Sequence, residues 1–296
     1  MKKVIVIGCG YLGYNIATLL ASEYDVKLWG LASPYDFSPL FQQVDAFDLS
    51  DNEKLELNEA IIIDALSLFP FNLQVEDETS FLAQFIDKYN GLFDVFKQCH
   101  INQYIYLSSG GTVYGNCGHA CDEDAPLNGM NLNLYSRSKI YLEKVIQHSG
   151  LAYTIIRLSN PYGGYQLTNR KQGVIPVLIE CALNQREFHC WNTLESKRDY
   201  IYISDVAHAL SLLIDQHKVN AIYNVGSGVS TTLETIINTV EHCTNATVPL
   251  VQEPVDPNIV ADSLLNIDKL KHETQFEPKV SLALGISEEV KRIKGE

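Results

Sequence analysis

The sequence predicts an α/β protein whose helices cover both faces of a doubly wound parallel β-sheet. Two observations in the first half of the 296-residue chain support this fold class. Short apolar runs recur without polar interruption, which is typical of strands buried on both faces. Stretches with the periodicity of amphipathic helices separate these runs. Continuous apolar strands with helices between them indicate a parallel sheet covered on both sides.

The expected elements follow one another in chain order. Strands are predicted at 4–7, 26–29, 61–63, 104–107 and 153–158. Helices are predicted at about 12–22, 80–99 and 135–148, the last ending before Gly150.

Beyond Pro161-Tyr-Gly-Gly164 the regular alternation gives way to shorter elements. A helix is expected near 175–183, a strand at 200–203 and another helix from Ser204. We expect residues 1–160, together with about 197–215, to form the larger domain. Residues 161–196 and 216–296 then form a smaller C-terminal lobe interleaved with it, and ligands usually bind in the cleft between such lobes.

Composition excludes two classes of partner. The formal net charge of -14 repels a phosphate backbone, so we expect no nucleic-acid partner. No run approaches the ~18 apolar residues of a membrane-spanning helix, so we expect no membrane partner.

The seven cysteines are odd in number and scattered, and they fit no disulfide framework. The chain also opens on a strand without a signal peptide, which together predicts a reducing cytoplasm. Cys117-Gly-His-Ala-Cys121 lacks a fourth ligand at recognisable spacing, so no metal site is expected.

The segment Gly8-Cys-Gly-Tyr-Leu-Gly13 follows the first strand and opens the first helix. In this context a G-x-G-x-x-G spacing predicts a Rossmann-type dinucleotide site. Gly8 permits a tight turn, Gly10 lets the backbone approach a pyrophosphate, and Gly13 allows close helix packing. The alternative is a tight strand-to-helix turn without a ligand.

The choice between NAD and NADP stays open in the sequence. An acidic residue at the end of the second strand usually binds the ribose 2′-hydroxyl of NAD, but here that strand ends in Gly30. No arginine in Leu31-Ala-Ser33 is available for the 2′-phosphate of NADP.

Tyr135 and Lys139 are four residues apart in a predicted helix, so their side chains lie on one face. A nearby ammonium lowers the pKa of a tyrosine by about 1 to 3 units from its usual value near 10. The phenol then exchanges protons near neutral pH. The alternative is an exposed tyrosine beside a solvated lysine.

These residues belong to a longer set that resembles the extended short-chain dehydrogenase/reductase family. Within that family, the chain is most similar to NAD-dependent nucleotide-sugar epimerases and dehydratases of the UDP-glucose 4-epimerase type. The resemblance rests on the glycine loop, Asp48-Leu49, Ser108 to Gly115, Tyr135-Ser-Arg-Ser-Lys139, Arg157 to Gly163, Arg198 to Asp205, Tyr223-Asn-Val-Gly226 and Phe276-Glu-Pro-Lys-Val280.

The resemblance implies a set of site residues. The catalytic residues would be Tyr135 and Lys139, with a hydroxyl from Ser109 or Thr112. The cofactor would contact Gly8, Gly10, Tyr11, Leu12, Gly13, Asp48, Leu49, Ala65, Leu66, Ser108, Tyr135 and Lys139. A nucleotide-diphosphate sugar would contact Tyr114, Asn160, Val174 and Arg198.

Several of these residues have plainer alternatives. Arg198 fits a phosphate because its planar fork donates two parallel hydrogen bonds, but it could pair with Asp199 or Asp205 instead. Asp48 could belong to a solvated acidic loop, and Asn160 could be a turn residue before Pro161.

Three positions depart from the family pattern. Many members place a catalytic serine or threonine four residues before the tyrosine of Val-Tyr-Gly, where this chain has Gly110, so Thr112 is ranked slightly ahead of Ser109 as its replacement. The strand-four motif usually contains a histidine followed by small residues, whereas this chain has Ile63-Asp-Ala-Leu-Ser67. A second diphosphate arginine is missing near Pro254 to Asn258, which leaves Arg170 or Lys171 as substitutes.

The sequence therefore predicts redox chemistry on a nucleotide-diphosphate sugar. The first interpretation is a 4-epimerase that forms a transient 4-keto sugar, and the main alternative is a 4-keto nucleotide-sugar reductase. A dehydratase is disfavoured because Gly110-Gly-Thr112 replaces the expected Asp-Glu. A non-catalytic dinucleotide-binding protein is the lesser alternative.

The family often dimerises through the two long helices, here 80–99 and 135–148, so a homodimer is expected. Phe81, Phe85, Tyr89 and Phe93 form a stripe on the first of them. That stripe fits either an interface or the core.

Overall fold

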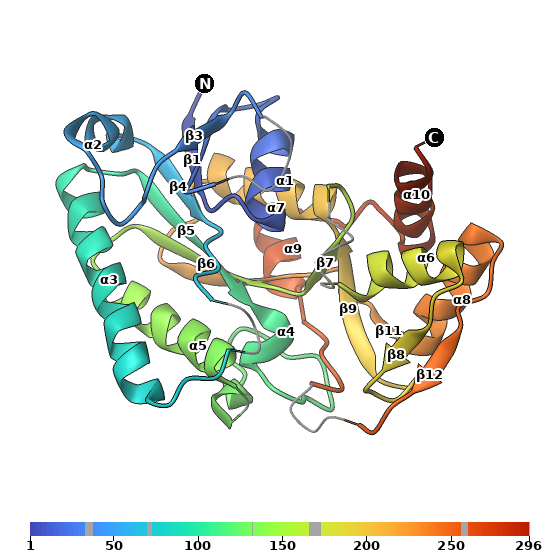
Figure 1. Cartoon of the computed structure of the whole chain (residues 1–296). Coiled ribbons are helices and arrows are strands. Elements are labelled where there is room, and N and C mark those ends of the chain that lie inside the picture. The colour runs from blue at the N-terminus through green and yellow to red at the C-terminus, as the bar shows by residue number, and fades with distance from the viewer. Residues whose placement is uncertain (33–37, 70–72, 132, 166–172, 256–259, 296) are drawn as a thin grey trace.

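A computed structural model describes residues 1–32, 38–69, 73–131, 133–165, 173–255 and 260–295. Its largest element is a parallel sheet of seven strands in the order β10-β6-β5-β4-β1-β2-β3 (Figure 1). The strands are β1 (Lys3–Ile7), β2 (Asp25–Gly30), β3 (Phe41–Gln43), β4 (Ile61–Asp64), β5 (Gln103–Ser109), β6 (Tyr153–Leu158) and β10 (Ala221–Val225). This sheet confirms the predicted fold class.

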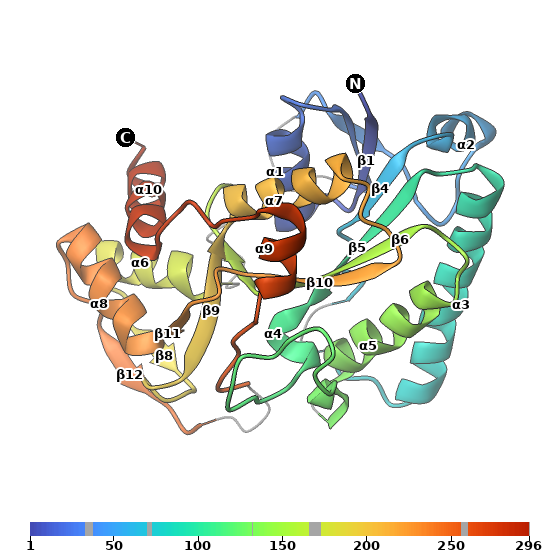
Figure 2. The same cartoon turned by 180° about the vertical axis from the view of Figure 1, so that it is seen from behind.

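Helices cover both faces of the sheet (Figures 1 and 2). On one face lie α1 (Tyr11–Leu20), α7 (Ile203–Asp215) and α9 (Asp268–Thr274), and on the other α3 (Glu78–Gln98) and α5 (Leu134–Gln147). Because successive strand residues point to opposite faces, Val4 and Val6 of β1 pack in the first layer and Ile5 and Ile7 in the second. The short α2 (Asp51–Leu57) begins at a capping box formed by Ser50 and Glu53.

A smaller lobe has a hydrophobic core of its own. It contains α6 (Val174–Asn184), α8 (Leu233–Thr244), α10 (Leu282–Lys294), the strand pair β8 (Phe188–Cys190) and β12 (Leu250–Gln252), and a three-stranded sheet of β7 (Asn160–Tyr162), β9 (Lys197–Tyr202) and β11 (Ser230–Thr232). Two further short elements, α4 (Gly110–Val113) and the 3₁₀ helix η1 (Asn128–Asn131), lie beside α5.

The strand pairings correct the predicted domain boundaries at two places. Residues 197–202 were assigned to the larger domain, but β9 pairs with β7 and β11 of the small sheet. Residues 216–296 were assigned to the smaller lobe, but β10 pairs in parallel with β6 of the large sheet. Tertiary pairing decides which sheet a short strand joins, and local sequence pattern does not carry that information.

Two buried carboxylates, those of Asp199 and Asp205, bind backbone segments where the chain passes between the two lobes. Asp199 accepts hydrogen bonds from the Ser227 amide at 2.8 Å, the Ser227 hydroxyl at 2.7 Å and the Gly228 amide at 3.0 Å. Asp205 accepts from the Lys279 amide at 3.1 Å and the Val280 amide at 3.0 Å. Within the described residues no helix is both long and apolar enough to cross a membrane.

Candidate active site

The glycine loop between β1 and α1 has the geometry that a dinucleotide needs. Gly8 has a φ of +106°, and a Cβ there would lie 2.8 Å from the Ala65 carbonyl carbon. A Cβ on Gly13 would lie 1.8 Å from the Gly8 carbonyl oxygen, whereas one on Gly10 would meet nothing within 4 Å among the described residues. Gly10 is also the N-cap of α1, and no described side chain caps that end. A helix N-terminus without a side-chain cap attracts an anion, so these residues fit a dinucleotide pyrophosphate.

The same loop is tied to the strand that opens the small lobe. The Tyr11 hydroxyl donates to the Gly163 carbonyl at 2.9 Å. Asn15, which is 4% exposed, accepts from the Tyr165 amide at 2.8 Å and donates to the carbonyls of Tyr165 and Tyr11. Sequence reasoning missed Asn15 because a polar residue inside an amphipathic helix carries no local signal of its partner.

At the adenosine end of the site, packing explains why the second strand lacks a carboxylate. A Cβ on Gly30 would lie 2.5 Å from the Cys9 sulfur of the glycine loop, so only glycine fits there without movement. Asp48 is exposed and Leu49 packs partly against the core behind α3, where both stay predicted adenine contacts.

The Tyr135 and Lys139 side chains lie on one face of α5, beside the end of β4. Asn133 caps the helix by accepting from the Ser136 amide at 2.9 Å. The Lys139 ammonium donates to the Leu107 carbonyl at 2.9 Å and lies 4.6 Å from the centre of the Tyr106 ring. A small pocket is lined by Leu66, Ser67, Tyr89, Tyr135, Ser138 and Lys139. Lys139 is 9% exposed, so its charge is largely removed from water.

The electrostatics of this pair differ from the sequence-based expectation. Burial raises the pKa of Tyr135, and a side-chain hydrogen bond with Ser109 acts in the opposite direction. Burial also lowers the pKa of Lys139 to about 8. The expected net lowering of the tyrosine pKa is therefore wrong for this structure, because desolvation of the phenol outweighs the effects that favour the phenolate.

The hydroxyl that forms a hydrogen bond with the Tyr135 phenol belongs to Ser109. The Thr112 hydroxyl, ranked first from the sequence, turns back toward the Ser109 carbonyl at 3.5 Å. A Cβ on Gly110 would lie 2.7 Å from a Leu265 methyl carbon and 2.9 Å from the Arg157 carbonyl oxygen. The space for a side chain at that position is therefore already filled by the chain's own C-terminal segment.

A buried polar network lies behind the pair. The Glu143 carboxylate accepts from the Ser108 hydroxyl at 2.5 Å and from the Arg157 guanidinium at 2.9 Å. Arg157 also donates to the Tyr114 hydroxyl at 2.9 Å, and that hydroxyl donates to Asn224 at 2.7 Å. Tyr114 is 2% exposed, and burial raises its pKa to about 12. Its predicted contact with substrate is thus corrected, since its hydroxyl is used inside the fold.

On the side of the small lobe, Asn160 and Arg198 lie on neighbouring strands. The Asn160 amide donates to the Asp199 carbonyl at 2.9 Å, and Arg198 donates to the Val260 carbonyl. Burial lowers the pKa of Arg198. The alternative ion pairs with Asp199 and Asp205 are not formed, because those carboxylates bind the backbone amides described above.

The other residues predicted to contact substrate are Val174, Arg170 and Lys171. Val174 begins α6 and is half-buried. Arg170 and Lys171 lie outside the described residues, as does much of the segment Pro254 to Asn258. Their contribution to a phosphate site stays a prediction.

Comparison with known proteins supplies the family. The sequence profile of the NAD dependent epimerase/dehydratase family matches residues 4–226. The chain belongs to this family. The match confirms the resemblance seen in the sequence, and membership makes NAD the cofactor.

Individual relatives in the family differ in their reactions. The chain is 34% identical over 207 residues to a dTDP-4-dehydro-6-deoxyglucose reductase of Escherichia coli, a match that covers 67% of this chain and 65% of that protein. It is 25% identical over 256 residues to a putative UDP-glucose 4-epimerase of Methanocaldococcus jannaschii, covering 79% and 80%.

Solved structures in the family share the fold over almost the whole chain. A UDP-glucose 4-epimerase of Thermotoga maritima with UDP-glucose superposes with a TM-score of 0.84 at 23% identity, covering 99% of both chains. The Thermus thermophilus UDP-glucose 4-epimerase complex with NAD gives 0.82 at 24% identity, again over 99% of both. At this level of identity the likeness concerns the fold.

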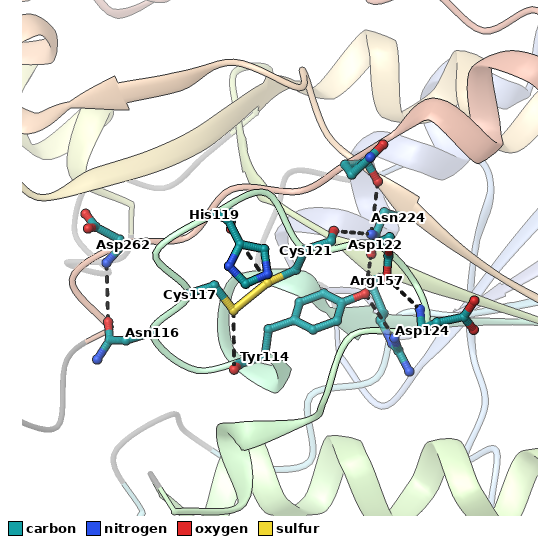
Figure 3. Close-up of a disulfide and its surroundings, with 11 residues drawn as sticks. Tyr114, Asn116, Cys117, His119, Cys121, Asp122, Asp124, Arg157, Asn224 and Asp262 are labelled. Atoms are coloured by element: carbon teal, nitrogen blue, oxygen red, sulfur yellow. Dashed lines mark hydrogen bonds between the residues drawn. A yellow bond between two sulfur atoms is a disulfide. The ribbon is translucent and has the colours of Figure 1, made fainter.

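One feature near the site contradicts the expectation for the cysteines. Cys117 and Cys121 form a disulfide in the loop that follows Tyr114 (Figure 3), while the other five cysteines are free. The same loop is held to the C-terminal segment, because Asn116 accepts from the Ala261 amide at 2.6 Å and the Cys121 amide donates to the Leu264 carbonyl at 3.0 Å. Among the described residues no cluster of His, Cys, Asp or Glu is arranged to hold a metal.

Two alanine substitutions in the glycine loop separate folding from cofactor binding. Gly13→Ala should lower the free energy of unfolding by about 1–3 kcal/mol, because its Cβ overlaps the Gly8 carbonyl. Gly10→Ala should leave the melting temperature unchanged but weaken NAD binding by about tenfold or more, since its methyl group enters open space beside the α1 amides. Calorimetry measures both quantities. Wild-type NAD affinity in Gly10→Ala would show that the pyrophosphate does not approach this loop.

Proposed function

We propose that this protein reduces a 4-keto nucleotide-diphosphate sugar, with Tyr135 as the proton donor. The observation that carries the direction is the 34% identity to a dTDP-4-dehydro-6-deoxyglucose reductase of Escherichia coli. Burial raises the pKa of Tyr135, so the phenol carries the proton that a reduction requires it to donate.

The larger domain would hold NAD through the amides that follow Gly8 and Gly10, the segment Ala65-Leu66 and the Lys139 side chain. NAD, when bound, supplies the hydride chemistry. The chain's own part is to position the sugar and to move one proton. Charged Lys139 then stabilises the phenolate that Tyr135 becomes once its proton has passed to the sugar oxygen.

Ser109 is the second hydroxyl of the proposed site. Its hydrogen bond with Tyr135 orients the phenol and favours its ionised form. A serine at this place also offers a donor to the sugar oxygen that receives the proton. Ser108, by contrast, holds Glu143 inside the fold and serves the site through α5.

The small lobe would bind the sugar nucleotide. Arg198 carries a largely desolvated guanidinium whose charge suits a diphosphate, and Asn160 lies on the adjacent strand β7. Val174, at the N-terminus of α6, would line the same site.

A second candidate function is 4-epimerisation of a nucleotide sugar. The relative from Methanocaldococcus jannaschii favours it, since that match covers 79% of this chain. The same phenol would then accept the proton from a sugar hydroxyl and return it. Convergence of Tyr135, Ser109 and Lys139 argues against a protein that only binds the dinucleotide.

The two candidates differ in net consumption of cofactor. We expect the purified protein to oxidise one NADH for each 4-keto-6-deoxy nucleotide sugar reduced, followed by absorbance and by chromatography of the product. Interconversion of UDP-glucose and UDP-galactose without net NADH consumption would instead support the epimerase. Neither reaction in a protein that binds NAD would contradict both candidates.

We also propose a homodimer formed by α3 and α5. The two helices lie side by side, with Arg137 of α5 paired to Glu78 of α3, and a groove between them is lined by Asn90, Lys97 and His148. Phe85, Tyr89 and Phe93 face the sheet core, so the outer residues, including the 38% exposed Tyr141, would make the interface.

Light scattering should give twice the 33.2 kDa monomer mass. Tyr141→Asp should shift the protein toward monomer, because it places a charge in the apolar part of the contact. The control is Leu284→Asp on α10 of the small lobe, where Leu284 is 50% exposed. A wild-type mass of one chain at micromolar concentration would refute the dimer.

A further inference from the structure

Asp64 is a buried acid at the end of β4 that the proposed mechanism does not use. Its side chain is 1% exposed, and in the sheet register it lies opposite Ile7 of β1 and Tyr106 of β5. A buried carboxylate is costly unless other groups stabilise it, so its partners show what it does.

Hydrogen-bond donors from three elements surround the Asp64 carboxylate. One oxygen accepts from the Tyr104 hydroxyl of β5 at 2.5 Å, and the other from the Leu66 amide at 2.8 Å. Tyr89 of α3 also hydrogen-bonds it. Donors of this kind favour the ionised form of a carboxylate, which opposes the effect of burial.

Lys139 is the nearby cation that lacks a close carboxylate. Its ammonium binds the Leu107 carbonyl and lies over Tyr106, the residue directly across from Asp64. Among the ion pairs of the described residues, none includes Lys139. Glu143, one turn further along α5, already accepts hydrogen bonds from Arg157 and Ser108. That leaves Asp64 as the carboxylate available to balance the Lys139 charge.

We propose that Asp64 is a positioning residue that acts as the counter-ion of Lys139 and keeps its ammonium charged beside Tyr135. The proposal deepens the proposed function, on which its catalytic meaning rests.

The other groups around Lys139 support this assignment. Burial lowers the pKa of Lys139 to about 8, and Asp64, followed by Glu143, acts in the opposite direction. Burial raises the pKa of Asp64, while Tyr104, Leu66, Lys139 and Tyr89 lower it. The remaining titratable neighbours are the phenols of Tyr106 and Tyr135, and Arg157 beyond Glu143.

Removal of the Asp64 charge has a definite sign. A cation that loses its counter-ion releases its proton more easily, so the pKa of Lys139 falls further below its wild-type value of about 8. Near neutral pH a larger fraction of the lysine would then be uncharged. The phenolate of Tyr135 would lose its stabilising charge, and the alkaline limb of kcat/KM against pH would move to lower pH.

The direct test is an NMR titration of isotope-labelled lysine in Asp64→Asn, with the Lys139 signal assigned by its loss in Lys139→Arg. We expect the Lys139 midpoint to fall by about 1 unit or more relative to wild type. Asp205→Asn is the matched control, since Asp205 is also buried, at 3% exposed, and its carboxylate also accepts hydrogen bonds from the backbone. That control should leave the midpoint in place. An unchanged midpoint in Asp64→Asn would overturn the proposal.

A second variant covers the case in which Asp64→Asn does not fold. Tyr104→Phe removes one donor from the Asp64 carboxylate and should lower the Lys139 midpoint by a smaller amount. An unchanged midpoint there would likewise count against the proposal. Because the titration needs no substrate, its outcome is independent of the reaction: a shifted midpoint in a protein without reductase or epimerase activity refutes the proposed function alone.

Discussion

The active site depends on how Glu143 anchors α5 to the carboxyl edge of the sheet. The Glu143 carboxylate accepts hydrogen bonds from the Ser108 hydroxyl on β5 and from the Arg157 guanidinium on β6. The side chains of Glu143 and Arg157 are both almost fully buried. Loss of one member of a buried pair leaves an uncompensated charge, which typically costs about 3–5 kcal/mol. One turn before Glu143 stands Lys139, and one turn before that stands Tyr135. The position of Tyr135, the proposed proton donor, therefore follows from an ion pair buried inside the fold.

Desolvation sets the chemical character of the site. The same layer between the sheet and α3 and α5 contains Tyr89, Tyr104 and Tyr106, all buried, and burial raises their pKa values together with that of Tyr135. Neutral phenols are favoured in this layer, which also contains the carboxyl group of Asp64 and the ammonium of Lys139. In a site of this kind Tyr135 keeps its proton until a ligand or cofactor changes the balance between the phenol and the phenolate.

Local patterns predicted the parts of the site that local geometry determines. The glycine spacing indicated the strand-to-helix turn, and the four-residue spacing placed Tyr135 and Lys139 on one helix face. The order of apolar runs likewise predicted the parallel sheet. Each of these features depends on residues that are neighbours in sequence.

Features that depend on distant contacts escaped sequence reasoning. The Leu265 side chain fills the space at Gly110, and Asn224 accepts a hydrogen bond from the Tyr114 hydroxyl. In both cases the partner is more than a hundred residues away in the sequence. β10 joins the large sheet only because β6 offers its free edge. The lowering of the Tyr135 pKa was expected from Lys139 alone, since burial of the phenol cannot be read from spacing.

The central claim is that Tyr135 transfers the proton. Tyr135→Phe tests it most directly, with Tyr141→Phe on the same helix as the control. We expect turnover of the 4-keto nucleotide sugar to fall by about 10² to 10⁴-fold while NAD affinity and melting temperature stay at wild-type values. Turnover equal to that of the control would contradict the account.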